Sequence, residues 1–261
     1  MKRSSRFPLM MSLVVGVLVL GGLGLVLTQT PQGAAQTPAP LVTYPDFPPT
    51  PTVGPNPTAP AGLASSNVLF QSAFADTRAL AEWQFVDQTY VIADLAAAWE
   101  VANGRLVQVG SGAARNPSSN EAAALVGAET WRDYTIRTSF YDEYNGVVGL
   151  IARYQGTEPT QSSYYRVRLF STEHQVSPKV VLEKVVDGVS TTLAETKTAG
   201  FSPRTWHTLA LSVQGANVQV QLDGQVLVAA QDTNPLPNGR AGLFTYAIGG
   251  IFFDDVAVTT P

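Results

Sequence analysis

The sequence contains no cysteine and only two histidines, and both shortages exclude kinds of site. Without cysteine the chain has no disulfide framework, no thiolate zinc site, no cysteine nucleophile and no lipid-modified cysteine anchor. Two histidines, His174 and His207, are too few for a zinc centre built from three. His207 follows Trp206 in a strand-like run and is expected to be a packed or half-exposed ring. Neither histidine is therefore expected to hold a metal or to act in catalysis.

Positive charge and local catalytic motifs are also scarce. Residues 67–261 carry thirteen basic and nineteen acidic side chains, a net charge of −6. This charge repels phosphates, which excludes a nucleic-acid partner. The sequence has no Gly-x-Ser-x-Gly nucleophile elbow and no glycine-rich phosphate loop.

Residues 1–27 read as a membrane-targeting segment. Three basic residues precede the uncharged apolar run Leu9–Leu27. Nineteen helical residues span about 28 Å, close to the ~30 Å hydrocarbon core of a bilayer. Basic residues before such a run predict that the rest of the chain is exported. We expect either a signal anchor, or a signal peptide cleaved at Gly33-Ala34-Ala35. The protein is thus extracellular, and either anchored to the cell membrane or secreted.

Residues 28–66 form a second, different segment. They contain ten of the 18 prolines, and Asp46 is their only charge. Proline removes backbone donors and fixes φ, so neither a helix nor a sheet ladder is expected. Extended at about 3.1 Å per residue, the segment could reach on the order of 100 Å. The sequence therefore predicts a Pro/Thr-rich disordered stalk.

Residues 67–261 show the period-two alternation of β-strands, clearest in Tyr134–Phe140 and Val218–Leu222. About a dozen such strands are too many for one open sheet. The predicted fold is all-β, an antiparallel two-sheet jelly-roll sandwich. Helical pattern is confined to Thr77–Phe85 and Ala93–Ala98.

Asn-Gly and Asp-Gly pairs between strand-like runs predict tight hairpins, because both residues tolerate positive φ. Three hairpins are expected from such pairs: Trp99–Val109 turning at Asn103-Gly104, Val180–Thr196 at Asp187-Gly188, and Val218–Ala229 at Asp223-Gly224. The expected core comprises Phe70, Phe74, Trp83, Trp99, Leu106, Trp131, Ile136, Leu150, Val167, Leu182, Trp206, Leu211, Val220, Leu243, Phe253 and Val256.

The order of short motifs along residues 68–259 resembles a known family. These motifs are Phe74-x-Asp76, Trp99-Glu-Val, Trp131-x-Asp133-Tyr-Thr, Gly149-Leu-Ile-Ala-Arg-Tyr154, Tyr164-Tyr-Arg166, Trp206-His-Thr-Leu209, Leu222-Asp-Gly224, Gly239-Arg-Ala-Gly-Leu243 and Phe253-Asp-Asp-Val256. They resemble concanavalin A-like, laminin-G-type jelly rolls, and among these are most similar to bacterial 3-keto-disaccharide hydrolase-like domains. The resemblance implies a fold that carries lectins, sugar-binding modules, glycosidases and inert spacers.

Whether the chain is an enzyme stays open at this point, with the weight against catalysis. Laminarinase-type enzymes of this fold carry Glu-x-Asp-x-x-Glu on one strand, and no such run occurs here. Adjacent Asp142 and Glu143 point to opposite faces of a strand. Glu183 and Asp187 lie on either side of an expected hairpin turn, so no local carboxylate pair is evident.

The resemblance also implies a structural calcium ion, because jelly rolls of this type often tie their N-terminal segment to the last strand through one. The corresponding residues are Asp76 and either Asp254 or Asp255. Ordinary hydrogen bonding of these carboxylates is the alternative.

A ligand-binding face is expected where tyrosine and arginine alternate. Gly149–Tyr154 and Tyr164–Leu169 read as the arms of a hairpin with the loop Gln155–Ser163. On the second arm Tyr164, Arg166 and Arg168 share one face, opposite Tyr165, Val167 and Leu169. The predicted ligand-binding residues are Tyr141, Tyr144, Arg153, Tyr154, Tyr164, Arg166 and Arg168. The alternative is a solvated sheet face whose tyrosines only cover the core.

Three functions follow. The first is a membrane-tethered, lectin-like domain that binds a glycan or another cell-surface ligand. The second is a sugar hydrolase, inferred from the resembling domains alone. The third is a structural protein-interaction module of the cell envelope, which an exposed apolar patch or a long edge strand would favour.

Overall fold

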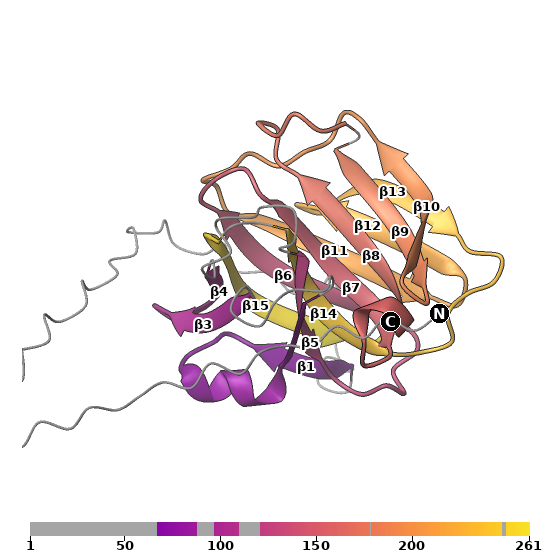
Figure 1. Cartoon of the computed structure of the whole chain (residues 1–261), viewed down its shortest axis with the longest axis horizontal. Coiled ribbons are helices and arrows are strands. Elements are labelled where there is room, and N and C mark those ends of the chain that lie inside the picture. The colour runs from indigo at the N-terminus through magenta and orange to yellow at the C-terminus, as the bar shows by residue number, and fades with distance from the viewer. Residues whose placement is uncertain (1–66, 88–96, 110–120, 178, 247–248) are drawn as a thin grey trace, which may run out of the picture. The chain divides into compact units, whose positions relative to one another are not determined.

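The computed structural model describes residues 67–87, 97–109, 121–177, 179–246 and 249–261 (Figure 1). The apolar run Leu9–Leu27 and the stalk 28–66 lie outside the described residues, so the anchor and the stalk stay predictions. Across the described ranges, no helix combines the length and the apolar character needed to cross a bilayer.

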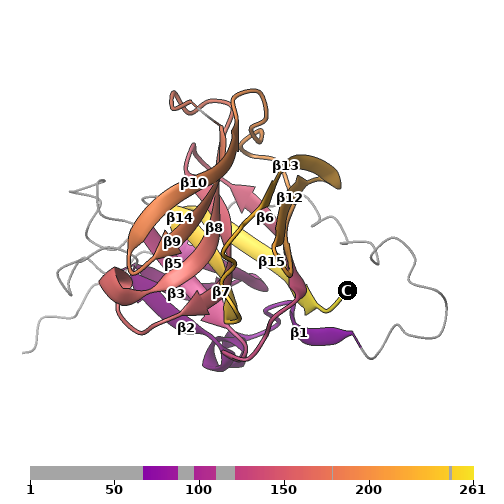
Figure 2. The same cartoon turned by 90° about the vertical axis from the view of Figure 1, so that its right-hand side faces the viewer.

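Two antiparallel sheets lie face to face, as Figure 2 shows. The eight-stranded sheet has the order β13 (Gln225–Gln231), β12 (Asn217–Leu222), β11 (His207–Gln214), β6 (Tyr134–Asp142), β15 (Ile251–Thr259), β4 (Arg105–Val109) and β3 (Ala98–Ala102), and β1 (Val68–Ser72) also pairs with β15. The seven-stranded sheet has the order β10 (Val189–Thr196), β9 (Val180–Val186), β8 (Ser163–Phe170), β7 (Val147–Gln155), β14 (Arg240–Tyr246), β5 (Glu121–Val126) and β2 (Gln84–Asp87). The predicted all-β, jelly-roll-like sandwich is therefore confirmed.

The hairpins form where the Asn-Gly and Asp-Gly pairs predict them. At the turn between β9 and β10, Asp187 has φ 49° and Gly188 has φ 76°. Two consecutive positive φ values characterise the turn whose twist matches antiparallel strands. In the turns between β3 and β4 and between β12 and β13, the Asn or Asp and the Gly that follows it also both have positive φ. The hairpin of β7 and β8 is also confirmed, with the short 3-10 helix η5 (Pro159–Gln161) in its loop.

The helical expectation for Thr77–Phe85 is wrong in type and extent. The segment forms a 3-10 helix, η1 (Thr77–Glu82), whose first turn is capped by the side chain of Asp76. Gln84 then begins β2, because Gln84–Asp87 pair in register with β5. Of the other helical candidate, residues 93–96 lie outside the described part of the chain, and Ala98 begins β3.

The main core lies between the two sheets and contains most of the predicted residues. Leu150, Val167, Leu211 and Phe253 are each fully buried there. Phe70, Trp99 and Trp131 are only partly buried and pack against its edge. Trp206 is the exception, since it belongs to a separate cluster with Val107 and Phe252. Phe252 alternates with the core residues of β15, so this cluster lies on the outer face of the eight-stranded sheet.

Candidate functional site

The site is built on the outer face of the seven-stranded sheet, the face turned away from the core. The alternation expected on β8 is confirmed: Tyr165, Val167 and Leu169 join the core, whereas Tyr164 and Phe170 belong to a second, outer cluster. Strands β7, β14, β5 and β9 contribute the rest of that cluster, namely Ala123, Leu125, Val147, Ile151, Tyr154, Val181, Val185 and Phe244.

Two arginines and two glutamates form an ion network on this face. The Arg166 guanidinium donates from Nη1 to Glu121 Oε2 at 3.0 Å and from Nε to Glu183 Oε2 at 3.0 Å. Arg168 donates from Nη2 to Glu183 Oε1 at 3.3 Å, and its Nη1 lies 3.8 Å from Glu121 Oε1. One guanidinium therefore binds two carboxylates that are 62 positions apart in the sequence, at positions 121 and 183.

Gly149 leaves room on β7 for the ring of Phe244, on which Arg166 packs. Gly149 lies on β7 between Arg168 of β8 and Phe244 of β14, with which it is in register. A Cβ atom at this position would stand 2.9 Å from Cδ1 of Phe244 and 2.0 Å from the carbonyl oxygen of Val167. The space is taken instead by the Phe244 ring, and the Arg166 guanidinium carbon lies 4.7 Å from that ring's centroid.

The network has a buried part and an accessible part. The side chains of Arg166 and Glu183 are each 7% exposed, whereas those of Arg168 and Glu121 are 30% and 20% exposed. Buried charges need partners, and Arg166 and Glu183 supply them to each other. Arg168 and Glu121 are thus the charged groups of this network that an external ligand can reach.

Aromatic rings flank the network. Tyr154 and Tyr164 are stacked, with centroids 5.2 Å apart and an interplanar angle of 21°. The guanidinium carbon of Arg166 lies 5.9 Å from the Tyr164 ring centroid, and that of Arg240 lies 5.5 Å from the Tyr154 centroid. Burial raises the pKa of Tyr164 to about 12, so its hydroxyl stays protonated at neutral pH.

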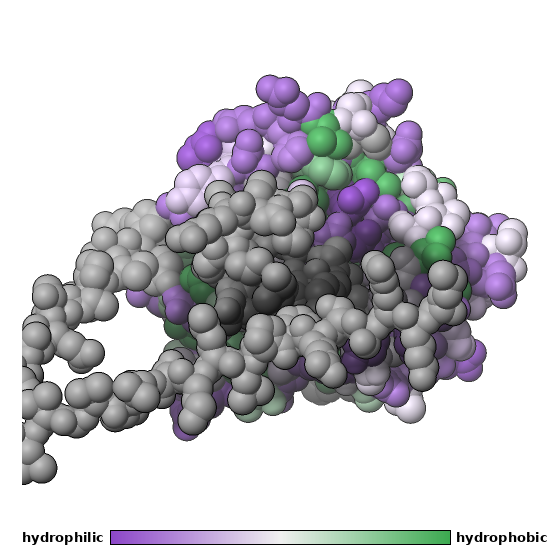
Figure 3. Space-filling view, viewed as in Figure 1, coloured by the Kyte–Doolittle hydropathy of each residue, from purple (hydrophilic) through white to green (hydrophobic). Residues whose placement is uncertain are grey.

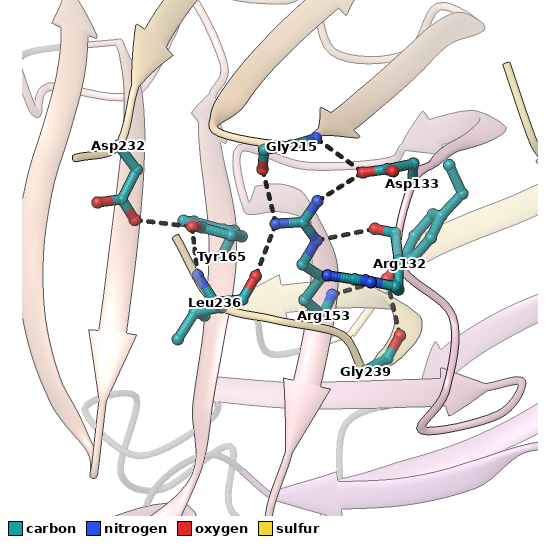
Figure 4. A network of polar contacts seen from close by, with 9 residues as sticks. Arg132, Asp133, Arg153, Tyr165, Gly215, Asp232, Leu236 and Gly239 are labelled. Carbon is teal, nitrogen blue, oxygen red and sulfur yellow. Dashed lines mark hydrogen bonds and ion pairs between the residues drawn. The ribbon is translucent and has the colours of Figure 1, made fainter. Parts of the chain in front are cut away.

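Arg153, predicted to bind ligand, points away from this face. A bulge in β7 gives it φ 52° and turns its side chain inward, where it is 2% exposed. Nε donates to the Arg132 carbonyl oxygen, Nη1 to the carbonyl oxygens of Gly215 and Leu236, and Nη2 to Asp133 Oδ1 (Figure 4). Arg153 therefore joins β7 to segments of the other sheet, and each of its three side-chain nitrogens has a partner within the protein.

The other predicted tyrosines lie apart from the network. Tyr141 is on β6 of the eight-stranded sheet, where its ring centroid lies 5.6 Å from that of Trp206. Tyr144 is 52% exposed in the turn between β6 and β7. Of the seven predicted residues, the structure brings together Tyr154, Tyr164, Arg166 and Arg168.

Asp76 and Asp254, which were predicted to bind calcium, accept hydrogen bonds within the protein. Both Asp76 oxygens accept from the Arg78 guanidinium, at 2.6–3.2 Å. Asp254 Oδ1 accepts from the backbone N–H of Asp255, and Asp255 has φ 49° at a bulge in β15. In the described ranges, no group of three or more His, Asp or Glu side chains is placed to hold a metal ion. The calcium site stays a prediction from the resemblance.

Sequence reasoning missed Glu121 and Phe244, and saw Glu183 only beside a turn. Glu121 begins β5, which reaches the site because β14 inserts between β5 and β7. β14 follows β5 by more than a hundred residues in the sequence, and no local pattern encodes their pairing. The alternation in β5 places Glu121 on the same face as Ala123 and Leu125, but it does not reveal what lies opposite.

Comparisons with known proteins agree with this architecture. No curated protein matches the chain in sequence. The solved structures that are similar in fold include the following three. A carbohydrate-binding module of Bacillus subtilis (CBM66) is 17% identical, with a TM-score of 0.51 over 69% of this chain and 96% of its own. A Bacillus subtilis protein of unknown function with a galectin-like fold is 12% identical, with a TM-score of 0.56 over 74% and 96%. The β-glucanase of Bacillus licheniformis is 14% identical, with a TM-score of 0.51 over 74% and 97%.

The fold is thus one that carbohydrate-binding modules and glycosidases share. The family model of the 3-keto-alpha-glucoside-1,2-lyase-like domain matches residues 69–259, nearly all of the two-sheet domain. The resemblance read from the ordered motifs is confirmed by this match. The chain belongs to the 3-keto-alpha-glucoside-1,2-lyase-like domain family.

Proposed function

We propose that the domain binds carbohydrate on the outer face of its seven-stranded sheet, with Arg168 and Glu121 as the polar contacts. The observation that carries this proposal is the partly exposed end of the ion network. A sugar hydroxyl both donates and accepts, and there it meets a guanidinium donor and a carboxylate acceptor side by side. Arg166 and Glu183 beneath hold the two groups in place.

The charge of the site favours a neutral saccharide. Two arginines and two glutamates balance, so neither a sulfated sugar nor an amino sugar gains a net electrostatic attraction. The rings of Tyr154, Tyr164 and Phe244 are buried, and those of Tyr164 and Phe244 pack against Arg166, so these rings support the charged groups rather than contact a sugar ring.

We further propose that this domain is displayed outside the cell on the stalk 28–66. The support is the sequence pattern of a basic N-terminus, the apolar run Leu9–Leu27 and a proline-rich segment. Anchoring would present the binding face to glycans of the surroundings or of a neighbouring cell surface.

A glycan array probed with the full chain tests the binding proposal. We expect signal on neutral glycans, and loss of that signal in Arg168→Ala with an unchanged melting temperature. Arg78→Ala is the matched control, because Arg78 is also an ion-paired arginine but lies on η1, outside the network. Equal signal from Arg168→Ala and the wild type would contradict the assignment of the site.

A second candidate is catalysis on a 3-keto-glucoside, and one specific observation favours it. Two carboxylates, Glu121 and Glu183, meet at one guanidinium in a domain of the lyase-like family. A keto group on carbon 3 acidifies the proton on carbon 2, so a carboxylate base can remove it. A double bond then forms between carbons 1 and 2 as the bond from carbon 1 to the leaving oxygen breaks, and that oxygen takes a proton from water. Glu121 is the more exposed of the pair and is our candidate for the base.

Incubation of the full chain with methyl 3-keto-alpha-glucoside distinguishes the two functions. Release of methanol that is lost in Glu121→Gln would establish the enzyme. Binding of the glucoside without turnover would leave the lectin-like function.

The third expectation, a protein-interaction module, has weaker support. Among the residues that the structure describes, the exposed large hydrophobic ones are Val68, Leu69, Phe85, Tyr144, Val176, Val186, Val189 and Val226. On the side seen in Figure 3, hydrophobic atoms form small, separate patches among hydrophilic ones. Scattered residues of this kind are normal on a soluble surface and do not mark an interface.

A further inference from the structure

His174 lies at the rim of the proposed binding face, in the connection between β8 and β9. Its ring packs edge-on against Phe170, with the centroids 5.1 Å apart. Phe170 belongs to the outer cluster, and the guanidinium carbon of Arg168 lies 5.8 Å from the same phenyl ring. His174 and Arg168 therefore share one aromatic neighbour at the accessible end of the ion network.

The connection is organised around this histidine. The His174 backbone N–H donates to the carbonyl oxygen and to Oγ of Ser171, both at 3.1 Å. Lys179 Nζ donates to the carbonyl oxygens of Ser171 and His174. The backbone N–H of Val176 donates to Nδ1 of the imidazole at 3.1 Å. The ring is thus fixed by its packing on Phe170 and by a hydrogen bond to one of its two nitrogens.

That bond determines which nitrogen carries the proton. Nδ1 accepts from Val176, so in the neutral imidazole the hydrogen is on Nε2. Burial, reinforced by the charge of Lys179, lowers the pKa of His174 and favours this neutral form. Within the described part of the chain, Nε2 has no hydrogen-bond partner.

The other histidine is a useful contrast. His207 has both ring nitrogens engaged, Nδ1 with Asp223 Oδ2 at 2.7 Å and Nε2 with the carbonyl oxygen of Ser202 at 3.0 Å. Its ring also packs against Phe140 and Phe201. His207 is a structural residue, whereas His174 keeps a donor that nothing in the described residues uses.

We propose that His174 contacts the bound saccharide by donating a hydrogen bond from Nε2 to a sugar oxygen. This inference rests on the proposed carbohydrate-binding function and extends its site beyond Arg168 and Glu121. The binding face then offers a neutral donor beside a charged donor and an anionic acceptor, a set suited to several oxygens of an uncharged sugar.

Two substitutions of His174 distinguish the role of Nδ1 from that of Nε2. His174→Asn keeps an oxygen near the position of Nδ1 for the Val176 N–H but removes the donor near Nε2. His174→Gln places an amide N–H near the position of Nε2. Glu173→Gln is the matched control, because Glu173 is the adjacent exposed residue and pairs with Arg204 instead.

Calorimetric titration of the full chain with methyl 3-keto-alpha-glucoside, maltotriose, cellotriose and laminaritriose measures the effect. For the sugars that the wild type binds, we expect His174→Asn to weaken affinity about 5–10-fold, the value of one hydrogen bond. His174→Gln and Glu173→Gln should stay near the wild-type affinity. Unchanged affinity in His174→Asn would overturn the role of His174 and leave the proposed function standing. No binding of any sugar by the wild type would overturn both.

A measurement without sugar tests the premise. With only two histidines, the imidazole ¹⁵N signals of the labelled chain can be assigned by comparing the wild type with His174→Gln. We expect the Nε2–H form for His174 at pH 7.5. The Nδ1–H form would overturn the proposal whatever the titrations show.

Discussion

Arg166 on β8 lies over the ring of Phe244 on β14, with its guanidinium carbon 4.7 Å from the ring centroid. Strand β7 runs between these two strands, and its Gly149, in register with Phe244, leaves the space that the phenyl ring occupies. A cation over an aromatic face is stabilised most when it is desolvated, and the side chain of Arg166 is 7% exposed.

Gly149→Ala should therefore be costly although the change is a single methyl group. The added Cβ would collide with the backbone of Val167 and the Phe244 ring, so the strands or the ring must shift. We expect a loss of about 1–3 kcal/mol in unfolding free energy, measured in urea. Gly104→Ala is the comparison, since nothing lies within 4 Å of its Cβ and only its positive φ resists, at roughly 1 kcal/mol. Equal costs at the two positions would contradict the crowding argument.

We expect Arg153 to stabilise the folded domain rather than to bind ligand. Its removal leaves the buried carbonyl oxygen of Leu236 without a donor and breaks the pair with Asp133. Lost bonds of this kind cost about 1–3 kcal/mol each, so Arg153→Ala should lower the unfolding free energy by at least about 3 kcal/mol. Arg78→Ala, on a pair whose side chains are 89% and 46% exposed, should leave the melting temperature nearly unchanged. A stable Arg153→Ala variant that loses glycan binding would restore Arg153 to the ligand site.

Local patterns were sufficient to predict much of this fold. The turn at Asp187-Gly188 and the alternation in β8 each depend on neighbours in the sequence. The bulge that turns Arg153 inward does not, because it is an extra residue that breaks the alternation on which the prediction relied. After the bulge, Tyr154 regains the outer face and Arg153 joins the other sheet.

The ion network is the part of the site least accessible to sequence reasoning. Arg166 and Glu183 lie opposite each other on β8 and β9, which are consecutive strands along the chain. Its link to Glu121 requires β14, near the C-terminus, to pair with both β7 and β5. The contact between Arg166 and Glu121 depends on the order of strands in the sheet, and no short stretch of the sequence encodes that order.

Stability should fall as pH rises from about 5 to 7 because of Asp142. Burial raises the pKa of this carboxyl from 3.8 to about 6, although it accepts the backbone N–H groups of Tyr144 and Gly146. In this window the native state binds more protons than the unfolded chain. The contribution of Asp142 to the unfolding free energy is therefore present at low pH and is lost as the pH rises through 6. The lowered pKa of His174 acts in the opposite direction, so a direct comparison with a variant is needed.

Asp142→Asn provides that comparison, because it removes one titrating group and leaves the histidines unchanged. Between pH 5 and 7.5, the stability of the wild type relative to the variant should fall by about 1 kcal/mol. Urea unfolding at both pH values measures it. A constant difference would show that Asp142 titrates normally.

Chelation should leave the melting temperature of the full chain unchanged. A calcium ion was expected to tie Asp76 to β15, but β1 is already joined to β15 by a ladder in which Ser72 pairs with Val256. Asp76 is occupied by Arg78, which holds the pKa of its carboxyl down to about 2. Thermal unfolding in EDTA and in added calcium provides the check. A lower melting temperature in EDTA, reversed by calcium, would place a cation in the domain and contradict this reading.

Substitutions of Glu121 and Glu183 should affect glycan binding and protein stability differently, although both carboxylates bind Arg166. Glu183→Gln leaves a buried guanidinium with one charged partner fewer, so it should lower the melting temperature as well as weaken glycan binding. Glu121 is more exposed, and water can replace its carboxylate at Arg166. Glu121→Gln should therefore lose affinity while its melting temperature stays near that of the wild type. The two measurements on the two variants form a test of the accessible end of the network. If Glu183→Gln reduced binding without loss of stability, the ligand would reach the buried carboxylate, and the binding surface would extend toward β9.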